Sequence, residues 1–357
     1  MAKKILVVDD SALMRRVLCD IINSDERFEV QDRAVNGLEA LDLLTRNSYD
    51  AVVLDVNMPQ MNGLELLKEL QKRKISARVM MASTDTKEGA KTTLDSLELG
   101  ALDFVHKPNN AMDCRTDAFK DRMLRILSVV ADSKAPTFGK TFTMEELKTS
   151  KKMVELVSKH ASAVTGDKVV ALASSTGGPK ALQSVIPRLP KNLKAPVVIV
   201  QHMPAGFTAS LAERLDSLSE IHVKEAVEGD VLEAGNVYLA MGGRHLNIKQ
   251  AMGKYSIHYT DQPTREGVRP CANYMYESLM DSRYDQVVCV VMTGMGADGT
   301  EGIQHLKEKK KIHVIAQEAS TCAVYGMPKS VVNAGLTDQI VPLDQIAQEI
   351  IMNVGVK

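Results

Sequence analysis

The chain contains short apolar segments that do not alternate with polar residues, and this feature limits its fold most. Such runs are typical of strands buried on both faces of a parallel sheet that helices cover on each side. Three of them precede residue 109 and four follow residue 167, with helix-like segments between them: 5–8, 51–56, 78–83, 168–174, 195–202, 286–294 and 311–317. Two doubly wound α/β domains are therefore expected.

The length of 357 residues also suits two domains better than one core. We expect a first domain over residues 1–108, a helical connector over 109–166, and a second domain over 167–357. In the second domain, the segments 237–248 and 254–260 predict an inserted antiparallel hairpin.

Charge and hydropathy exclude several classes of protein. The 44 lysines and arginines nearly balance 45 aspartates and glutamates, so no net field favours nucleic acid or an anionic membrane. No apolar stretch approaches the roughly 20 residues of a membrane helix. The start MAKKILVVDD predicts a strand and not a signal peptide, and the five scattered cysteines predict reduced thiols. A soluble cytoplasmic protein is expected, without nucleic-acid binding or membrane insertion.

Acidic residues end two strands of the first predicted sheet. Asp9 and Asp10 follow the first strand and Asp55 ends another, so all three carboxylates should meet at the carboxyl edge. Mg²⁺ would relieve their repulsion and neutralise a phosphoryl group. Ser83 ends the next apolar run, and Lys107 adds a positive charge. This set suits phosphoryl transfer to Asp55.

The segments VDDSALMR, LDVNMPQMNGLELL, MAS and ELGALDFVHKP together resemble the response-regulator receiver family over residues 1–108. The resemblance implies a flavodoxin-like fold in which Asp55 is phosphorylated. It implies that Asp9 and Asp10 help Asp55 to bind Mg²⁺, and that Ser83 and Lys107 contact the phosphoryl group.

Two further expectations come from the receiver resemblance. Phe104 falls where the family keeps a rotating aromatic side chain, and is expected to act as a switch. A sensor histidine kinase of a two-component system is the implied phosphodonor.

A candidate nucleophile lies in a turn of small residues in the second domain. Ser175 follows an apolar strand and precedes a helix, in a stretch that approximates the G-x-S-x-G elbow with Ala173 in place of the first glycine. The N–H groups of the following helix could face an oxyanion. Such a turn can also do no more than cap a helix, so catalysis requires partner residues.

Two candidate partners leave the ends of other apolar strands. His202 lies just past one strand, and Asp298 follows another through a glycine-rich loop. A neutral imidazole can accept a serine proton near pH 7, and a carboxylate can orient it. The chain order Ser, His, Asp differs from that of α/β-hydrolases, chymotrypsin and subtilisin, so analogy with those folds is unsafe.

The segments SSTGG, QHMP, TGMGADG and AQEASTCAVYGMP resemble the catalytic domain of the chemotaxis protein-glutamate methylesterases, the CheB family. The resemblance runs from about residue 169 to near the carboxyl end. It implies that Ser175 is the nucleophile, His202 the general base and later acid, and Asp298 the orienting carboxylate. It also places Thr176 and Met295 beside the reacting carbonyl, with a backbone N–H of Met295 as an oxyanion donor.

The two resemblances together imply a phosphorylation-activated esterase and glutamine deamidase that acts on methyl-accepting chemotaxis receptors. The catalytic domain is expected to need no cofactor, the unphosphorylated receiver to block it, and the chain to be a monomer. Two alternatives remain open at this point. One is a phosphorylation-controlled module that binds receptor or kinase without catalysis, and the other is the same esterase in a non-chemotactic receptor system.

Overall fold

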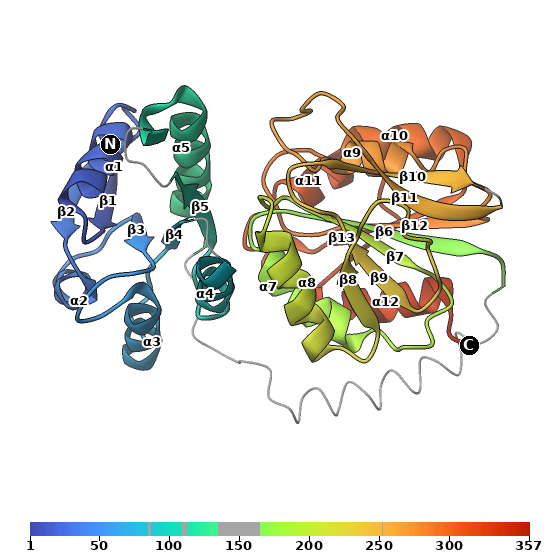
Figure 1. Ribbon diagram of the computed structural model, residues 1–357, viewed down its shortest axis with the longest axis horizontal. Coiled ribbons are helices and arrows are strands. Elements are labelled where there is room, and N and C mark those ends of the chain that lie inside the picture. Colours follow the sequence, from blue (N-terminus) through green and yellow to red (C-terminus); the bar gives the residue numbers. More distant parts are fainter. Residues whose placement is uncertain (85–86, 109–112, 135–164, 252) are drawn as a thin grey trace. The chain divides into compact units, whose positions relative to one another are not determined.

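The computed structural model of the chain describes residues 1–84, 87–108, 113–134, 165–251 and 253–357. The chain divides into two compact units, Met1–Gly139 and Lys140–Lys357. Each unit is built around a parallel sheet with helices beside it (Figure 1). No described helix combines the length and the apolar composition needed to cross a membrane.

The first unit contains a five-stranded sheet in the order β2-β1-β3-β4-β5, and all its neighbouring strands are parallel. Its strands are Lys3–Val8 (β1), Phe28–Ala34 (β2), Ala51–Asp55 (β3), Val79–Thr84 (β4) and Asp103–Lys107 (β5). Its helices are Ala12–Asn23 (α1), Gly37–Arg46 (α2), Gly63–Arg73 (α3), Lys87–Glu98 (α4) and Asp117–Asp132 (α5). This strand order is that of flavodoxin-like folds, as the sequence predicts.

Side-chain caps fix where several of these helices begin. The side chains of Ser11 and Asn36 accept hydrogen bonds from the first turns of α1 and α2. At α3, Asn62 and Glu65 form a capping box in which each side chain bonds the other's backbone N–H. Such caps pair N–H groups that the helix itself leaves free. They set the helix starts close to the carboxyl ends of the preceding strands.

The first domain extends beyond residue 108, so the sequence-based boundary needs correction. Helix α5, which we had expected in the connector, buries Phe119, Met123 and Leu127 in the same core as Val7 of β1 and other residues of the five-stranded sheet. Its apolar face is covered by this sheet and by α1, and the helix is therefore part of the first unit. The second connector helix, expected near residues 144–160, lies outside the described residues.

The second unit contains a seven-stranded parallel sheet in the order β14-β13-β12-β6-β7-β9-β8. Its strands are Lys168–Ser174 (β6), Val197–Gln201 (β7), His222–Glu225 (β8), Asn236–Leu239 (β9), Gln286–Val291 (β12), Ile312–Gln317 (β13) and Gln339–Val341 (β14). Its helices are Gly178–Val185 (α7), Phe207–Leu218 (α8), Ala272–Glu277 (α9), Thr300–Lys309 (α10), Met327–Asn333 (α11) and Ile346–Val354 (α12). β6 lies between β7 and β12.

The predicted hairpin is present but shorter than expected. His245–Ala251 (β10) and Lys254–Thr260 (β11) form a two-stranded antiparallel sheet. The preceding β9, which we had included in the hairpin, pairs instead in parallel with β7 and β8 in the main sheet. Its residues Val237, Tyr238 and Leu239 are all buried, as expected for a strand covered on both faces.

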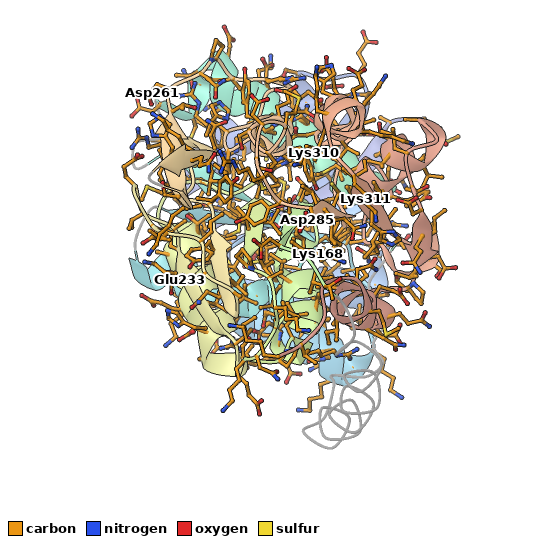
Figure 2. All side chains as sticks on the ribbon, turned by 90° about the vertical axis from the view of Figure 1, so that its right-hand side faces the viewer. Lys168, Glu233, Asp261, Asp285, Lys310 and Lys311 are labelled. Carbon is orange, nitrogen blue, oxygen red and sulfur yellow. The ribbon has the colours of Figure 1, made fainter. Side chains whose placement is uncertain are left out.

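The amino edge of the seven-stranded sheet carries charged residues, whereas the carboxyl edge holds the candidate site. Lys168, Asp285 and Lys311 lie at or next to the first residues of β6, β12 and β13, and Figure 2 labels all three. Lys168 donates to the backbone carbonyl of Asn353 at 2.6 Å, and Asp285 accepts from the N–H of Asp167 at 2.7 Å. These two contacts tie strand β6 and its entry to neighbouring segments.

Candidate active site

Ser175 lies in a tight turn between β6 and α7 that only a glycine two residues later allows. Its N–H donates to the carbonyl of Thr293 at 3.0 Å, and its carbonyl accepts from the N–H of Gly178 at 2.7 Å. Gly177 has a φ of +76°, and a Cβ there would lie 2.6 Å from the Cβ of Ala323. The left-handed turn and the close approach both require glycine. The turn leaves Ser175 partly exposed at the carboxyl edge.

Gln201, the last residue of β7, holds the ends of β6 and β7 together. Its Oε1 accepts from the Ser174 hydroxyl at 2.7 Å, and its Nε2 donates to the Ser175 carbonyl at 2.9 Å. The His202 N–H also donates to the Ser174 carbonyl at 3.1 Å. We did not single out Gln201 from the sequence. A buried polar residue that ends an apolar strand, beside a candidate histidine, is the signal that could have found it.

His202 and Asp298 form a buried pair. The distance from His202 Nε2 to Asp298 Oδ2 is 2.7 Å, and the two side chains are 9% and 2% exposed. Because Nε2 is bonded to the carboxylate, Nδ1 is the ring nitrogen that remains to accept a proton from another group. The predicted contact between base and orienting acid is therefore present.

Asp298 receives three further hydrogen bonds, all from the start of α9. The backbone N–H groups of Ala272 and Asn273 donate to Oδ2 and Oδ1 at 2.6 and 2.9 Å. The thiol of Cys271 donates to Oδ1 at 3.0 Å. Burial favours the neutral acid, but the hydrogen bonds from His202, Cys271 and Ala272 outweigh it and hold the pKa of Asp298 below its ordinary value. The carboxylate therefore stays ionised beside the imidazole.

Asn273 fixes the backbone that follows Asp298. Its Oδ1 accepts from the N–H groups of Gly299 and Gly302 at 3.0 and 2.7 Å, and its Nδ2 donates to Glu266 at 3.0 Å. The side chain is fully buried. Neither Asn273 nor Cys271 carried a sequence signal, because both lie about 25 residues before Asp298 and meet it only through the docking of α9.

Ser175 shares an edge with the His202–Asp298 pair. Among the described residues, no hydrogen bond joins its hydroxyl to His202. The segment after β12 runs directly beside it, since a Cβ on Gly294 would lie 2.7 Å from the Cβ of Ser175. β6, β7 and β12 are neighbours in the sheet, so all three candidate residues leave the carboxyl ends of adjacent strands. That a complete triad forms stays a prediction.

Thr176 and Met295, the expected neighbours of the reacting carbonyl, differ in exposure. Thr176 is buried, and its carbonyl accepts from the Thr293 hydroxyl at 2.9 Å. Met295 follows Gly294 and is 37% exposed. The carbonyl of Gly294 accepts from the N–H groups of Gly326 and Met327 at 3.0 and 2.9 Å, so the backbone before Met295 is held firmly. The oxyanion role of the Met295 N–H stays a prediction.

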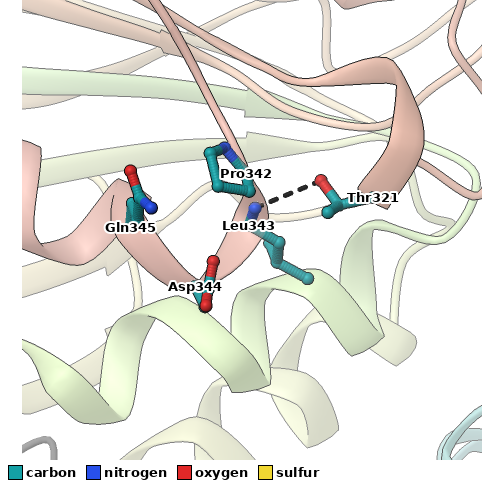
Figure 3. Close-up of a pocket in the computed structure, with 5 residues that line it drawn as sticks. All are labelled: Thr321, Pro342, Leu343, Asp344 and Gln345. Carbon is teal, nitrogen blue, oxygen red and sulfur yellow. Dashed lines mark hydrogen bonds between the residues drawn. The ribbon is translucent and has the colours of Figure 1, made fainter.

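A pocket at the ends of β13 and β14 lies outside this arrangement. Its lining residues are Thr321, Pro342, Leu343, Asp344 and Gln345 (Figure 3). The N–H of Leu343 donates to the Thr321 hydroxyl at 3.1 Å across it. None of the candidate catalytic residues lines this pocket.

The acidic cluster of the first unit forms as predicted. One carboxylate oxygen from each of Asp9, Asp10 and Asp55 can be chosen so that all three lie within 4.8 Å of one another. Asp9 and Asp55 are buried and Asp10 is exposed. Lys107 Nζ lies 2.9 Å from Asp9 Oδ2 and 2.8 Å from Asp55 Oδ1. These oxygen donors are of the kind that Mg²⁺ prefers.

The charges of this cluster are opposed by burial. Burial raises the pKa of Asp55 above its ordinary value, although the nearby Lys107 ammonium acts in the other direction. Burial also opposes the charge of Lys107, but Asp55 and Asp9 outweigh it and raise the pKa of the lysine. Lys107 is therefore a permanent cation between two acids.

The two remaining predicted residues of this unit are both buried. Ser83 accepts a hydrogen bond from the Thr93 hydroxyl of α4 at 2.8 Å. Phe104 lies on β5, and its N–H donates to the Asp103 side chain at 2.8 Å. A switching motion of Phe104 stays a prediction.

Comparisons with known proteins agree with both halves of the sequence analysis. The sequence-family model of the response regulator receiver domain matches residues 5–118, and the family model of the CheB methylesterase matches residues 170–350. A protein-glutamate methylesterase/protein-glutamine glutaminase of Geobacillus kaustophilus is 42% identical over 352 residues, which cover 99% of each chain. A protein of the same name from Pyrococcus horikoshii is 42% identical over 99% of this chain and 94% of its own.

A solved structure supports the fold of the second unit. The catalytic domain of the Thermotoga maritima CheB methylesterase matches with a TM-score of 0.50 and 43% identity, over 53% of this chain and 98% of that domain. Together with the full-length relatives, this match decides between an enzyme and a non-catalytic binding module in favour of the enzyme. The chain belongs to the CheB family of protein-glutamate methylesterases and protein-glutamine glutaminases, carboxylic ester hydrolases that carry a response-regulator receiver domain.

Proposed function

We propose that this chain removes methyl groups from glutamates of methyl-accepting chemotaxis receptors when its receiver domain is phosphorylated. It also converts selected receptor glutamines to glutamate. The names of its full-length relatives support the two reactions, and the receiver domain supports the control. The observation that carries the mechanism is the 2.7 Å contact between His202 Nε2 and Asp298 Oδ2 at the edge where Ser175 lies.

The proposed chemistry is acyl transfer through Ser175. Its hydroxyl oxygen attacks the side-chain ester carbonyl while Nδ1 of His202 accepts the hydroxyl proton. His202 then gives this proton to the departing methoxy oxygen, and methanol leaves. A water molecule attacks the acyl-serine with His202 again as base, and the proton returns to Ser175 as glutamate is released. Asp298 keeps the imidazole oriented and stabilises its cationic form.

The oxyanion of each tetrahedral intermediate needs hydrogen-bond donors. We assign this role to the backbone N–H of Met295, with Thr176 beside the reacting carbonyl. The bonds that hold Gly294 support the assignment, because a rigid backbone keeps a donor aimed without further ordering. A glutamine amide would follow the same steps with ammonia as the leaving group.

The receiver domain is proposed to accept a phosphoryl group on Asp55 from the sensor histidine kinase of the chemotaxis system. Asp9, Asp10 and Asp55 would hold Mg²⁺, which supplies charge neutralisation for the transferred group. Their oxygens lie close enough to share one cation. Lys107 and Ser83 would contact the phosphoryl oxygens, and Phe104 would respond by changing its rotamer.

Control of the esterase is proposed to follow from the two states of the receiver. The unphosphorylated receiver would cover the edge that carries Ser175 and exclude a helical receptor segment. Phosphorylation would favour a receiver surface that fits there less well. A shift of a few kcal/mol between the two states is enough to change activity by orders of magnitude.

Methanol release from a methylated receptor fragment tests the proposal, with acetyl phosphate and Mg²⁺ to phosphorylate the full-length chain. Ser175→Ala should lower kcat on the order of 10³-fold or more. Ser184→Ala is a matched control, because Ser184 lies on α7 with its hydroxyl bonded within the helix at 3.3 Å. Release at the normal rate by Ser175→Ala protein would refute the mechanism.

A further inference from the structure

The carboxylate of Asp298 has more donors than its role beside His202 requires. His202 Nε2 and the Ala272 N–H bond to Oδ2, at 2.7 and 2.6 Å. The Asn273 N–H and the Cys271 thiol bond to Oδ1, at 2.9 and 3.0 Å. Three of these donors are a ring nitrogen or backbone groups. The fourth is the side chain of Cys271, which lies outside the proposed Ser175–His202–Asp298 set.

The Cys271 thiol is in a state that can donate. Its residue is fully buried. Burial and the negative charge of Asp298 raise the pKa of the thiol well above its ordinary value, so it keeps its proton. A protonated thiol is a weak donor, and an ionised carboxylate is the acceptor that strengthens such a bond most.

We propose that Cys271 is a positioning residue for ester hydrolysis, and that its thiol holds Oδ1 of Asp298 so that Oδ2 stays directed at His202. This inference rests on the proposed Ser175–His202–Asp298 mechanism. The thiol touches neither the substrate nor the imidazole in that mechanism. It acts only through the carboxylate.

The physical reason is the cost of leaving a buried carboxylate oxygen short of donors. Without the thiol, Oδ1 would keep only the Asn273 N–H. The carboxylate would then resist rotation less, and Oδ2 would be directed at His202 Nε2 in a smaller fraction of the molecules. This reduces the fraction of enzyme with a correctly oriented base.

Another buried cysteine of the same domain provides a matched control. Cys289 lies in β12 within the apolar core, and the contacts of the described residues give its thiol no hydrogen-bond acceptor. Serine at position 271 would still face Asp298 and could donate in place of the thiol. Serine at position 289 would bury a hydroxyl without a partner. The same substitution should therefore have opposite consequences at the two sites.

The test uses the full-length chain with acetyl phosphate, Mg²⁺ and a methylated receptor fragment, and measures kcat, KM and Tm. Cys271→Ala should lower kcat by about threefold to tenfold with KM unchanged. Cys271→Ser should restore kcat, and Cys289→Ala should leave kcat unchanged. Cys289→Ser should lower Tm without changing kcat.

A wild-type kcat in Cys271→Ala would overturn the proposal, as would a Cys271→Ser variant as impaired as Cys271→Ala. If Cys271→Ala does not fold, Cys271→Val fills the space without a donor and is compared with Cys271→Ser in the same way.

The Asp298→Asn variant distinguishes a failure of the thiol's role from a failure of the proposed catalytic mechanism. If it loses activity while Cys271→Ala does not, only the role of the thiol fails; if it keeps wild-type kcat, the proposed mechanism fails and the thiol's role with it.

Discussion

The two domains both place carboxylates at the carboxyl edge of a parallel sheet, but they surround them differently. Asp298 has four hydrogen-bond donors, and three of them, His202, Cys271 and Ala272, outweigh its burial and lower its pKa. Asp55 shares one cation with another acid, and burial raises its pKa. The sheet edge thus supplies a position, and the neighbours decide the chemistry. The carboxylate of Asp298 is fully hydrogen-bonded, as its proposed role in orienting a base requires, while that of Asp55 has fewer donors, as its proposed reaction with a phosphoryl group requires.

Removing the charge of Asp298 should give the largest effect on turnover. Asp298→Asn keeps the shape of the side chain but places an amide where His202 needs an acceptor. We expect kcat for methanol release to fall about 10³-fold or more, because the imidazole is then neither correctly oriented nor stabilised as a cation. A decrease of less than tenfold in steady-state turnover would show that Asp298 does not act as the orienting carboxylate.

At Asp55, we expect a substitution to change the activation of the esterase by phosphorylation and not the rate of the chemical step. Asp55→Asn cannot form an acyl phosphate, so the ratio of activities with and without acetyl phosphate and Mg²⁺ should fall to one. The ratio itself is the measurement, which makes it independent of enzyme concentration. Persistent stimulation of this variant would mean that phosphorylation on Asp55 does not control the esterase.

The support of Asp298 can be weakened without touching the carboxylate. Asn273→Ala would leave the N–H groups of Gly299 and Gly302 without their acceptor. We expect a loss of about 1–3 kcal/mol in the free energy of unfolding of the catalytic domain, measured by urea denaturation. Asn247→Ala serves as a control, because the side chain of Asn247 donates to Thr260 of the β10–β11 hairpin and to the nearby Gln262. Equal stability of the Asn273→Ala and wild-type domains would contradict the role of this asparagine.

The opposite pKa shifts of Asp298 and Asp55 should give the smallest effect, which is a change in the pH dependence of the free energy of unfolding. The lowered pKa of Asp298 contributes stability above its unfolded-state pKa, and this contribution is lost as the pH falls through the folded value. The raised pKa of Asp55 has the opposite sign, so its destabilising effect at neutral pH is relieved as the pH falls through the folded value.

Thermal unfolding between pH 7 and pH 4, compared with Asp298→Asn and Asp55→Asn variants, measures these two contributions. The stability difference between wild type and Asp298→Asn should shrink in acid. The corresponding difference for Asp55→Asn should favour the variant at pH 7 and decline in acid. The same sign of pH dependence at both residues would contradict the comparison.

Much of this arrangement could be predicted from the sequence because reactive residues follow apolar strands. Asp9, Asp55, His202 and Asp298 each end or follow an apolar run that is typical of a buried strand, and parallel strands bring such ends to one edge. The helix Asp117–Asp132 was wrongly assigned to the connector. Its amphipathic pattern indicates that one face is buried, but the pattern does not indicate which sheet covers that face.

The donors around Asp298 could not be predicted for a different reason. Cys271 and Asn273 reach it only because the short helix α9 docks beside the loop after β12. The first residues of α9 contain no sequence motif that predicts this contact. Likewise, the short apolar sequence of β9 does not show whether it pairs with the following β10 or with β7 and β8 of the main sheet, as the structure has it.

The His202–Asp298 pair is proposed to activate the Ser175 hydroxyl. The most direct measurement is reaction of the full-length protein with a serine-directed phosphonate, followed by mass spectrometry of the labelled peptide. We predict a single adduct on Ser175 in the wild type, and labelling slowed on the order of 10³-fold in a His202→Gln variant. An adduct on another residue, or equal labelling rates in the two proteins, would contradict the account.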